Sequence, residues 1–241
     1  MFEGMEPVEV EHGGTTLRGY AARPAADGPV PAVLVMHSAL GIAHGVNEPV
    51  ARKLADEGYL AICTDMYGAH LEGAGIEDAG LAYADNLGAP DRQRERTVAW
   101  FDAIAGRPDV DDTRVAAVGF CYGGTTVLEL ARSGAALRAA VSYHGILTTH
   151  RPAEPGTISG HVVAYCGAGD PYAPLADVDA LRDELAHAGV RYQVTTFGSV
   201  GHGFTDPDAA RLELEGVSYD ELANDLSWNG TLVLLRHVFG S

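Results

Sequence analysis

The segment GFCYGG at residues 119–124 has the residue types and spacing of a nucleophilic site. It follows the apolar run RVAAVGF and precedes a helical pattern, which places Cys121 on a tight turn between a strand and a helix. Such a turn lifts the sulfur clear of a sheet, and the start of the helix favours thiolate over thiol. Side chains at positions 119 and 123 would collide with neighbouring backbone, which explains the glycines. We predict Cys121 as a nucleophile and the N–H of Tyr122 as an oxyanion donor.

A cysteine of this kind needs a general base and an acid that orients the base. On turns of this type the order along the chain is nucleophile, acid, histidine. Asp170 lies in CGAGDPYAP, where an apolar run ends in a glycine-rich turn, and His202 lies between two glycines in GHGF. Order and context predict Cys121, Asp170 and His202 as a catalytic triad.

Other residues of the same types fit these roles less well. His144 precedes Asp170, which is the wrong order along the chain. His37 ends an apolar run, where we expect it to shape a loop, and His187 falls on a solvated helix face. The remaining alternatives are acids near the two predicted loops: Asp177, Asp179, Asp206 and Asp208.

A second oxyanion donor is expected from the loop HSALG at residues 37–41, which follows the apolar run PAVLVMH. In folds with this turn, that loop lies beside the nucleophile and contributes a backbone N–H. We assign the donor to Ala39, with Leu40 as the alternative. The competing interpretation is an ordinary connection between a strand and a helix.

The elements that position these groups alternate between strands and helices. Continuous apolar runs indicate strands that are buried on both faces, and their alternation with helices predicts a mostly parallel, doubly wound α/β sheet. In such sheets the active site lies at the carboxyl ends of the strands. We predict strands at 6–11, 15–22, 31–37, 59–65, 114–120 and 190–197 and within 137–145 and 161–170, and helices at 46–57, 91–105, 123–132, 175–187 and 218–238. Residues 66–90 and 146–160 are expected to be loops that shape the pocket.

Composition narrows the classes of partner and compartment. The chain has 33 acidic and 16 basic residues, a formal net charge of −17, which argues against nucleic acid and anionic membranes as partners. Three cysteines without framework spacing, no signal peptide and no apolar run of membrane length predict a cytoplasmic protein. Cys63 and Cys166 lie inside apolar runs and are expected to be buried hydrophobes. No metal or nucleotide motif occurs, so we expect neither a metal nor a cofactor.

The three segments GFCYGG, CGAGDPYAP and GHGF together resemble the dienelactone hydrolase family. The likeness extends over residues 7–238, through DGPVPAVLVMHSALGI and ARKLADEGYLAICTDMYG to YDELANDLSWNGTLVLLRHVF. The resemblance implies a single α/β-hydrolase domain over residues 1–241 with a Cys–His–Asp triad. It also implies cofactor-free hydrolysis of a small ester or lactone.

Two positions depart from the family pattern. Ser38 stands where well-known members have a glutamate that helps to activate the thiol, and Thr205 and Asp206 stand where they have an arginine that binds the substrate carboxylate. Asp206 would repel an anion, so we expect a related, uncharged ester or lactone rather than dienelactone itself. Arg92 or Arg96 could still supply a cation, although a solvated helix face is the preferred interpretation for both. The residues expected to bind substrate are Ser38, Leu40, Arg92 and Phe204.

Two alternatives of other functional classes stay open at this point. The first is a non-catalytic binding or interaction module on the same fold, with the loss of the glutamate at Ser38 as a symptom. The second is a thiol redox sensor, since an exposed cysteine with a low pKa can be oxidised. A monomer and a homodimer are equally compatible with the sequence.

Overall fold

The computed structural model describes residues 1–240, which form one eight-stranded sheet with the strand order β1-β2-β4-β3-β5-β6-β7-β8. The strands are β1 (Glu6–His12), β2 (Thr15–Ala22), β3 (Val30–Met36), β4 (Leu60–Thr64), β5 (Val110–Phe120), β6 (Ala139–Tyr143), β7 (His161–Gly167) and β8 (Arg191–Phe197). The α-helices are α1 (Asn47–Asp56), α2 (Ile76–Leu87), α3 (Pro90–Ala105), α4 (Tyr122–Arg132), α5 (Leu175–His187) and α6 (Glu221–Phe239). Two short 3₁₀ helices, η1 (Ala69–Leu71) and η2 (Ala209–Leu212), complete the chain.

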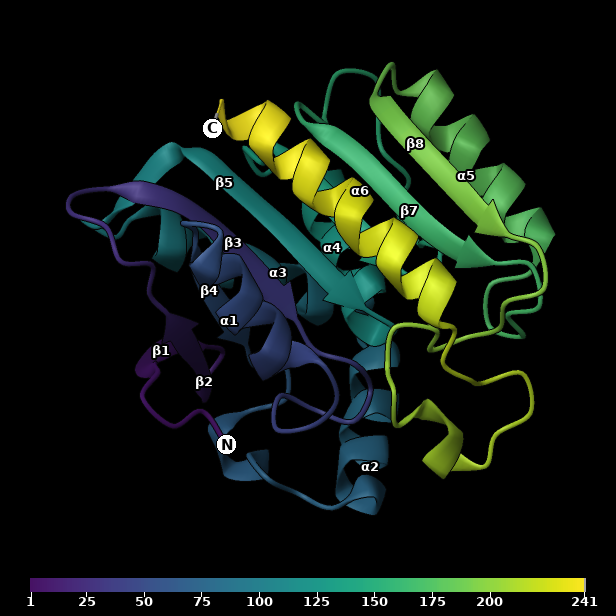
Figure 1. Cartoon of the computed structure of the whole chain (residues 1–241), viewed down its shortest axis with the longest axis horizontal. Coiled ribbons are helices and arrows are strands. Elements are labelled where there is room, and N and C mark those ends of the chain that lie inside the picture. The colour runs from purple at the N-terminus through teal and green to yellow at the C-terminus, as the bar shows by residue number, and fades with distance from the viewer. Residues whose placement is uncertain (241) are drawn as a thin grey trace.

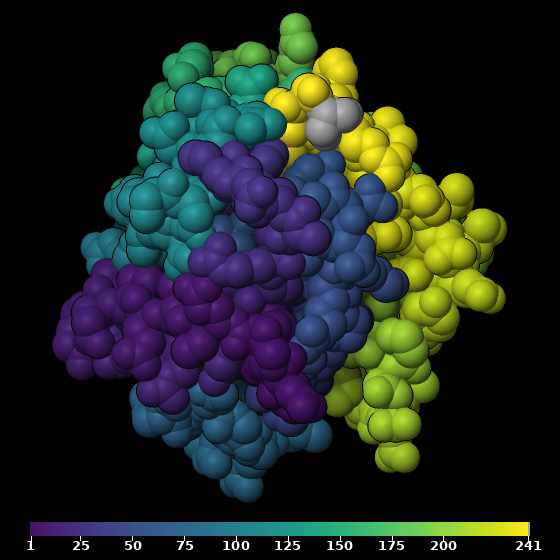
Figure 2. All heavy atoms as spheres, turned by 60° about the vertical axis from the view of Figure 1, so that its left-hand side comes forward, coloured from purple at the N-terminus to yellow at the C-terminus, as the bar shows by residue number. Residues whose placement is uncertain are grey.

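Strands β3 to β8 are parallel, and the N-terminal hairpin of β1 and β2 adds two antiparallel strands at one edge. The hairpin turns at Gly13 and Gly14, whose φ angles of 56° and 77° suit glycine in a two-residue turn. Tyr20 of the hairpin bonds to Glu72 next to η1. In Figure 2 the hairpin (purple) accordingly lies directly above the blue segment that contains η1 and α2.

Helices cover both faces of the sheet (Figure 1). One core contains apolar side chains of α3, α4 and α5, and the other contains side chains of α1 and α6. The residues of β3 alternate between these cores, with Leu34 and Met36 in the first and Val33 and Val35 in the second. A strand with an apolar core on each side cannot show alternating polarity, and this is why its sequence is a continuous apolar run. The predicted doubly wound α/β fold is confirmed.

The main element missed from the sequence is α2, which occupies part of the segment 66–90 expected to be a loop. Of its residues only Ala79 and Asn86 are buried, so it lacks the apolar stripe that predicts a helix. Strand β5 also begins earlier than predicted, at Val110, which pairs with Val30.

The carboxyl ends of the parallel strands all point toward one end of the molecule, next to α2 and the segment around η2 (Figure 1). The loop 37–41 follows β3, and Cys121 follows β5. Asp170 comes after β7 and His202 after β8. Parallel pairing thus brings together four segments that are far apart in the sequence.

Candidate functional site

Cys121 occupies a strained turn between β5 and α4. Its φ and ψ angles are 55° and −117°, in a region that non-glycine residues rarely adopt. A Cβ atom at Gly119 would lie 2.1 Å from the carbonyl oxygen of Gly123, and one at Gly123 would lie 2.1 Å from the carbonyl oxygen of Met36. Both distances are far inside van der Waals contact, so the two positions must be glycine, as the sequence analysis argued.

The three residues of the predicted triad lie together. The Nδ1 atom of His202 donates to Oδ2 of Asp170 at 2.8 Å, and both side chains are buried. The other oxygen of Asp170 accepts the N–H of Tyr172 at 2.8 Å, which fixes the carboxylate. The His202 backbone is held by the Gly216 carbonyl at 2.8 Å, and the imidazole reaches Cys121.

Electrostatics at Cys121 and His202 favour an ion pair. Burial by itself raises the pKa of the Cys121 thiol, but the hydrogen bond and charge of His202 and the backbone N–H groups of Ala39 and Tyr122 outweigh it, so the pKa is lowered. Burial likewise lowers the pKa of His202, whereas its bonds to Asp170 and Cys121 raise it to about 10. These opposite shifts favour thiolate and imidazolium together. In contrast, burial raises the pKa of Cys166 to about 12.

The loop after β3 presents its backbone to the sulfur in a defined orientation. His37 is fully buried, its Nε2 accepts the N–H of Met66 at 3.0 Å, and its Nδ1 therefore carries the proton and donates to the Ser38 carbonyl at 2.6 Å. In a trans peptide the C=O and the following N–H point in opposite directions. The bond to His37 thus turns the N–H of Ala39 toward Cys121. The N–H of Leu40 instead bonds to the Ser38 hydroxyl at 3.3 Å, which favours Ala39 over Leu40 as the second donor.

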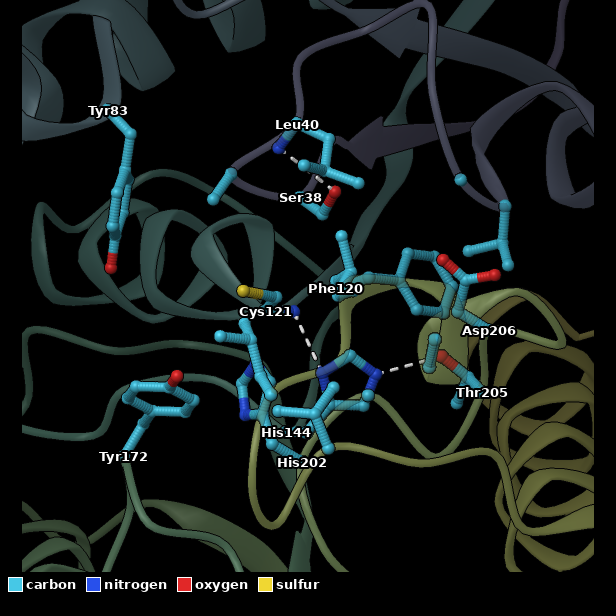
Figure 3. Close-up of a pocket in the computed structure, with 18 of the residues that line it drawn as sticks. Ser38, Leu40, Tyr83, Phe120, Cys121, His144, Tyr172, His202, Thr205 and Asp206 are labelled. Atoms are coloured by element: carbon cyan, nitrogen blue, oxygen red, sulfur yellow. Dashed lines mark hydrogen bonds between the residues drawn. The ribbon is translucent and has the colours of Figure 1, made fainter. Parts of the chain in front are cut away.

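His144, set aside because of its position in the chain, lies against the nucleophile. Its Nδ1 accepts the backbone N–H of Cys121 at 3.1 Å, so its Nε2 carries the proton and donates to the Thr205 hydroxyl at 2.8 Å (Figure 3). Burial and the neighbouring His202 hold its pKa well below the usual range, so it is neutral. Chain order excludes His144 as the base but not as a support for the turn. The sequence feature that could have indicated this supporting role is SYHG, because it lies at the end of β6, the strand that pairs with β5.

A cavity of about 270 Å³ opens above the sulfur and is largely apolar. Its wall comes from the loop after β3, from α2 and from the segment after β8. The lining residues are Ser38, Ala39, Leu40, Gly45, Val46, Asn47, Ile76, Tyr83, Phe120, Cys121, His144, Ile146, Tyr172, His202, Gly203, Thr205, Asp206, Ala209, Leu212, Leu214 and Val217.

Two of the four residues expected to bind substrate do line this cavity, and two do not. Ser38 and Leu40 lie on its wall. Arg92 is directed away, because its guanidinium bonds to Asp85 at 2.6 Å, and Phe204 is fully buried in the core that contains α1 and α6. The expectation for Arg92 and Phe204 is therefore corrected. Arg96 is also buried and donates to the Met66 carbonyl at 2.6 Å, so neither arginine supplies a cation to the cavity.

Comparison with known proteins agrees with this arrangement. The model of the Dienelactone hydrolase family matches residues 17–239. The chain belongs to this family. A relative from Synechocystis sp., named as a carboxymethylenebutenolidase, is 28% identical over 88% of this chain and 90% of its own length. A Bradyrhizobium sp. relative named as a 2-oxo-3-(5-oxofuran-2-ylidene)propanoate lactonase is 26% identical over 98% and 96%.

Among solved structures, a dienelactone hydrolase-like promiscuous phosphotriesterase from metagenomic libraries is 34% identical, with a TM-score of 0.87 over 98% of both chains. Membership of the dienelactone hydrolase family makes the chain a hydrolase of esters or lactones. No helix within residues 1–240 is long and apolar enough to cross a membrane. In the same residues no three His, Cys, Asp or Glu side chains are grouped to hold a metal ion.

Proposed function

We propose that this dienelactone hydrolase family member cleaves small esters or lactones without negative charge, with Cys121 as nucleophile, His202 as general base and acid, and Asp170 as orienter of His202. The main support is the convergence of three donors on one sulfur atom: the His202 imidazole and the N–H groups of Ala39 and Tyr122. A cysteine that only fills space in a hydrophobic core does not need hydrogen-bond donors that stabilise its thiolate. Cys63 and Cys166, whose pKa values burial raises, are of that inert kind.

The reaction has two halves in this proposal. The Cys121 thiolate forms a bond to the carbonyl carbon, and the displaced electron pair becomes an oxyanion held by the two N–H groups. When the oxyanion collapses, the C–O bond to the alcohol breaks and the leaving alkoxide takes the proton of the His202 imidazolium. His202, now neutral, removes a proton from water, which attacks the thioester. The thiolate leaves, and the acid is released.

The lining residues of the cavity argue against a negatively charged substrate. Within residues 1–240 no arginine or lysine lines the cavity, whereas Asp206 does. A substrate carboxylate beside Asp206 would therefore lose its hydration and meet a charge of the same sign. This supports neutral esters and lactones over dienelactone itself.

Phosphotriester hydrolysis is a second activity that we propose to test. The metagenomic relative is a promiscuous phosphotriesterase. A phosphotriester, like a neutral ester, has no negative charge that Asp206 would repel. The same panel of assays covers it when a neutral aryl phosphotriester is added.

The deciding experiment measures hydrolysis of p-nitrophenyl acetate and small lactones by the wild type, Cys121→Ala and the matched control Cys166→Ala. We expect the control to keep its activity and Cys121→Ala to lose at least about a thousandfold. Full hydrolysis by Cys121→Ala would overturn the mechanism. No turnover by any form would favour the non-catalytic module, and reversible peroxide oxidation of Cys121 without hydrolysis would favour the redox sensor.

A further inference from the structure

The cavity has two chemically different sides. Figure 3 shows Tyr83 and Tyr172 on one side of Cys121, with Thr205 and Asp206 on the other. Asp206 is the only Asp, Glu, Lys or Arg side chain among the described residues that line the cavity. When a substrate displaces water from this carboxylate, a substrate group of opposite charge can compensate for the lost hydration.

Asp206 has no cation of its own. Its Oδ1 accepts the N–H of Asp208 at 2.9 Å, and no ion pair to its carboxylate exists within residues 1–240. Arg211, the arginine nearest to it in sequence, pairs with Asp208 instead, with Nε and Oδ1 3.1 Å apart. The second oxygen, Oδ2, is left with no hydrogen-bond partner in the same residues.

The free oxygen of Asp206 and a second oxygen lie near the same point beside Gly45, which lines the cavity. A Cβ atom at Gly45 would lie 3.5 Å from Oδ2 of Asp206 and 3.8 Å from the hydroxyl of Ser38. Gly45 has no side chain that could extend toward the two oxygens. The Ser38 hydroxyl already accepts the N–H of Leu40 and retains a further lone pair. Two acceptors from different loops thus face one place in the cavity.

Exposed acidic residues next to two of the lining residues also favour a cationic group in the ligand. Glu77 and Asp78 directly follow the lining residue Ile76 in the sequence, Glu213 and Glu215 flank the lining residue Leu214, and all four acids are exposed. Acids around an apolar opening concentrate cations there and repel anions. The net charge of −17 on the whole chain acts in the same direction.

We infer that Asp206 and Ser38 form a subsite for a cationic group, so that the enzyme prefers esters carrying an ammonium group in their acyl or alcohol part. The aromatic rings of Tyr83 and Tyr172 on the opposite side can hold either an apolar group or a cation by its contact with the ring face. This inference rests on the proposed hydrolase activity and adds the charge of the substrate to it.

The test uses two matched sets of esters, one with the variable group in the acyl part of a p-nitrophenyl ester and one with it in the alcohol part of an acetate. In each set the terminal group is trimethylammonium, its uncharged isostere tert-butyl, or carboxylate. In at least one set we expect kcat/KM to be about fivefold higher for the cation than for the isostere, and lower again for the anion. The ratio of cation to isostere should fall to about one in Asp206→Asn.

The matched control is Asp208→Asn, which removes the same charge two residues away and should keep the wild-type ratio. Asp206→Asn retains an oxygen for the N–H of Asp208, so the turn keeps its bond. A ratio of one in both sets, or a raised ratio that Asp206→Asn leaves unchanged, would overturn the cation subsite. Absence of hydrolysis of the uncharged isosteres and of p-nitrophenyl acetate would instead overturn the proposed function, so the two failures are distinguishable.

Discussion

The floor and the rim of the cavity are built in opposite ways. The floor consists of the turn at 119–124 and the loop at 37–41, and the rim consists of α2 and residues 207–217. In the floor, backbone lies so close to backbone that two positions accept only glycine, and His37 and His144 hold the peptide groups in place. On the rim, Ile76 is 64% exposed and Leu214 is 50% exposed. The difference indicates that the floor fixes the reacting atoms, whereas the rim selects what reaches them.

The largest expected effect comes from placing a side chain in the floor. Gly123→Ala drives a methyl group into the Met36 carbonyl, so we expect a loss of at least about 3 kcal/mol in the free energy of unfolding and no measurable hydrolysis. Gly80→Ala is the rim control, because its Cβ would meet nothing within 4 Å and Gly80 lies inside a helix. It should stabilise the protein by up to about 1 kcal/mol. Denaturant unfolding of both variants checks this, and equal stabilities would contradict the contrast.

Removing the negative charge of Asp170, which orients His202, should lower activity nearly as much as Gly123→Ala does, but without unfolding the protein. Asp170→Asn keeps the shape of the side chain but allows the wrong tautomer of His202, so kcat should fall about a thousandfold to ten-thousandfold. The exposed Asp179→Asn is the control and should retain activity. Measured kcat and melting temperatures separate the two effects; a loss below tenfold would show that His202 is oriented by other groups.

Substitution of the two buried histidines of the floor should lower kcat by different amounts, whereas substitution of an exposed histidine should leave kcat unchanged. His37→Phe releases the Ser38–Ala39 peptide, and loss of one oxyanion donor should lower kcat about a hundredfold. His144→Phe should have a smaller effect, because the N–H of Cys121 also bonds to the Tyr143 carbonyl at 3.0 Å. The exposed His187→Phe should behave as the wild type. Steady-state kinetics on one neutral ester ranks the three, and an equal loss for His37→Phe and His187→Phe would refute the role given to His37.

The ion pair predicts a change in the pH dependence of the thiol. Because His202 and the two N–H groups lower the pKa of Cys121, alkylation by iodoacetamide should stay fast below the ordinary thiol value of about 8.5. In His202→Ala burial dominates, so the midpoint should move above that value. Alkylation rates from pH 5 to pH 10, on the order of a dozen points, give both midpoints. Identical profiles would mean that His202 does not act on the sulfur.

The smallest effect is expected on the rim. Leu214→Ala removes apolar surface from a half-exposed side chain, so KM for a hydrophobic ester should rise about threefold while kcat changes less. Initial rates over a range of ester concentrations resolve the two constants. A fall in kcat as large as that of His37→Phe would show that the rim also positions the reacting atoms.

Much of the site could be predicted because its requirements are local in the sequence. A turn that carries a nucleophile needs small residues two positions before and two positions after it, and Gly119 and Gly123 occupy these positions around Cys121. A strand buried on both faces is a continuous apolar run, so most strand positions and the order of Cys121, Asp170 and His202 follow from the chain itself. Each of these features depends on a few neighbouring residues. The fold class follows from the alternation of strands and helices along the chain.

Tertiary structure decided the rest, because it depends on which strand ends become neighbours and where each side chain then points. His144 comes 23 residues after Cys121, and only the pairing of β5 with β6 brings it to the Cys121 N–H. Arg92 and Phe204 have suitable chemistry for a substrate site, yet Arg92 bonds to Asp85 and Phe204 enters the core. The weak apolar pattern of α2 gave no indication of the helix that forms part of the cavity wall. The sequence by itself determined the predicted reacting groups and their order, whereas the packing of separate strand ends determined which neighbours hold them and which of the expected substrate-binding residues line the cavity.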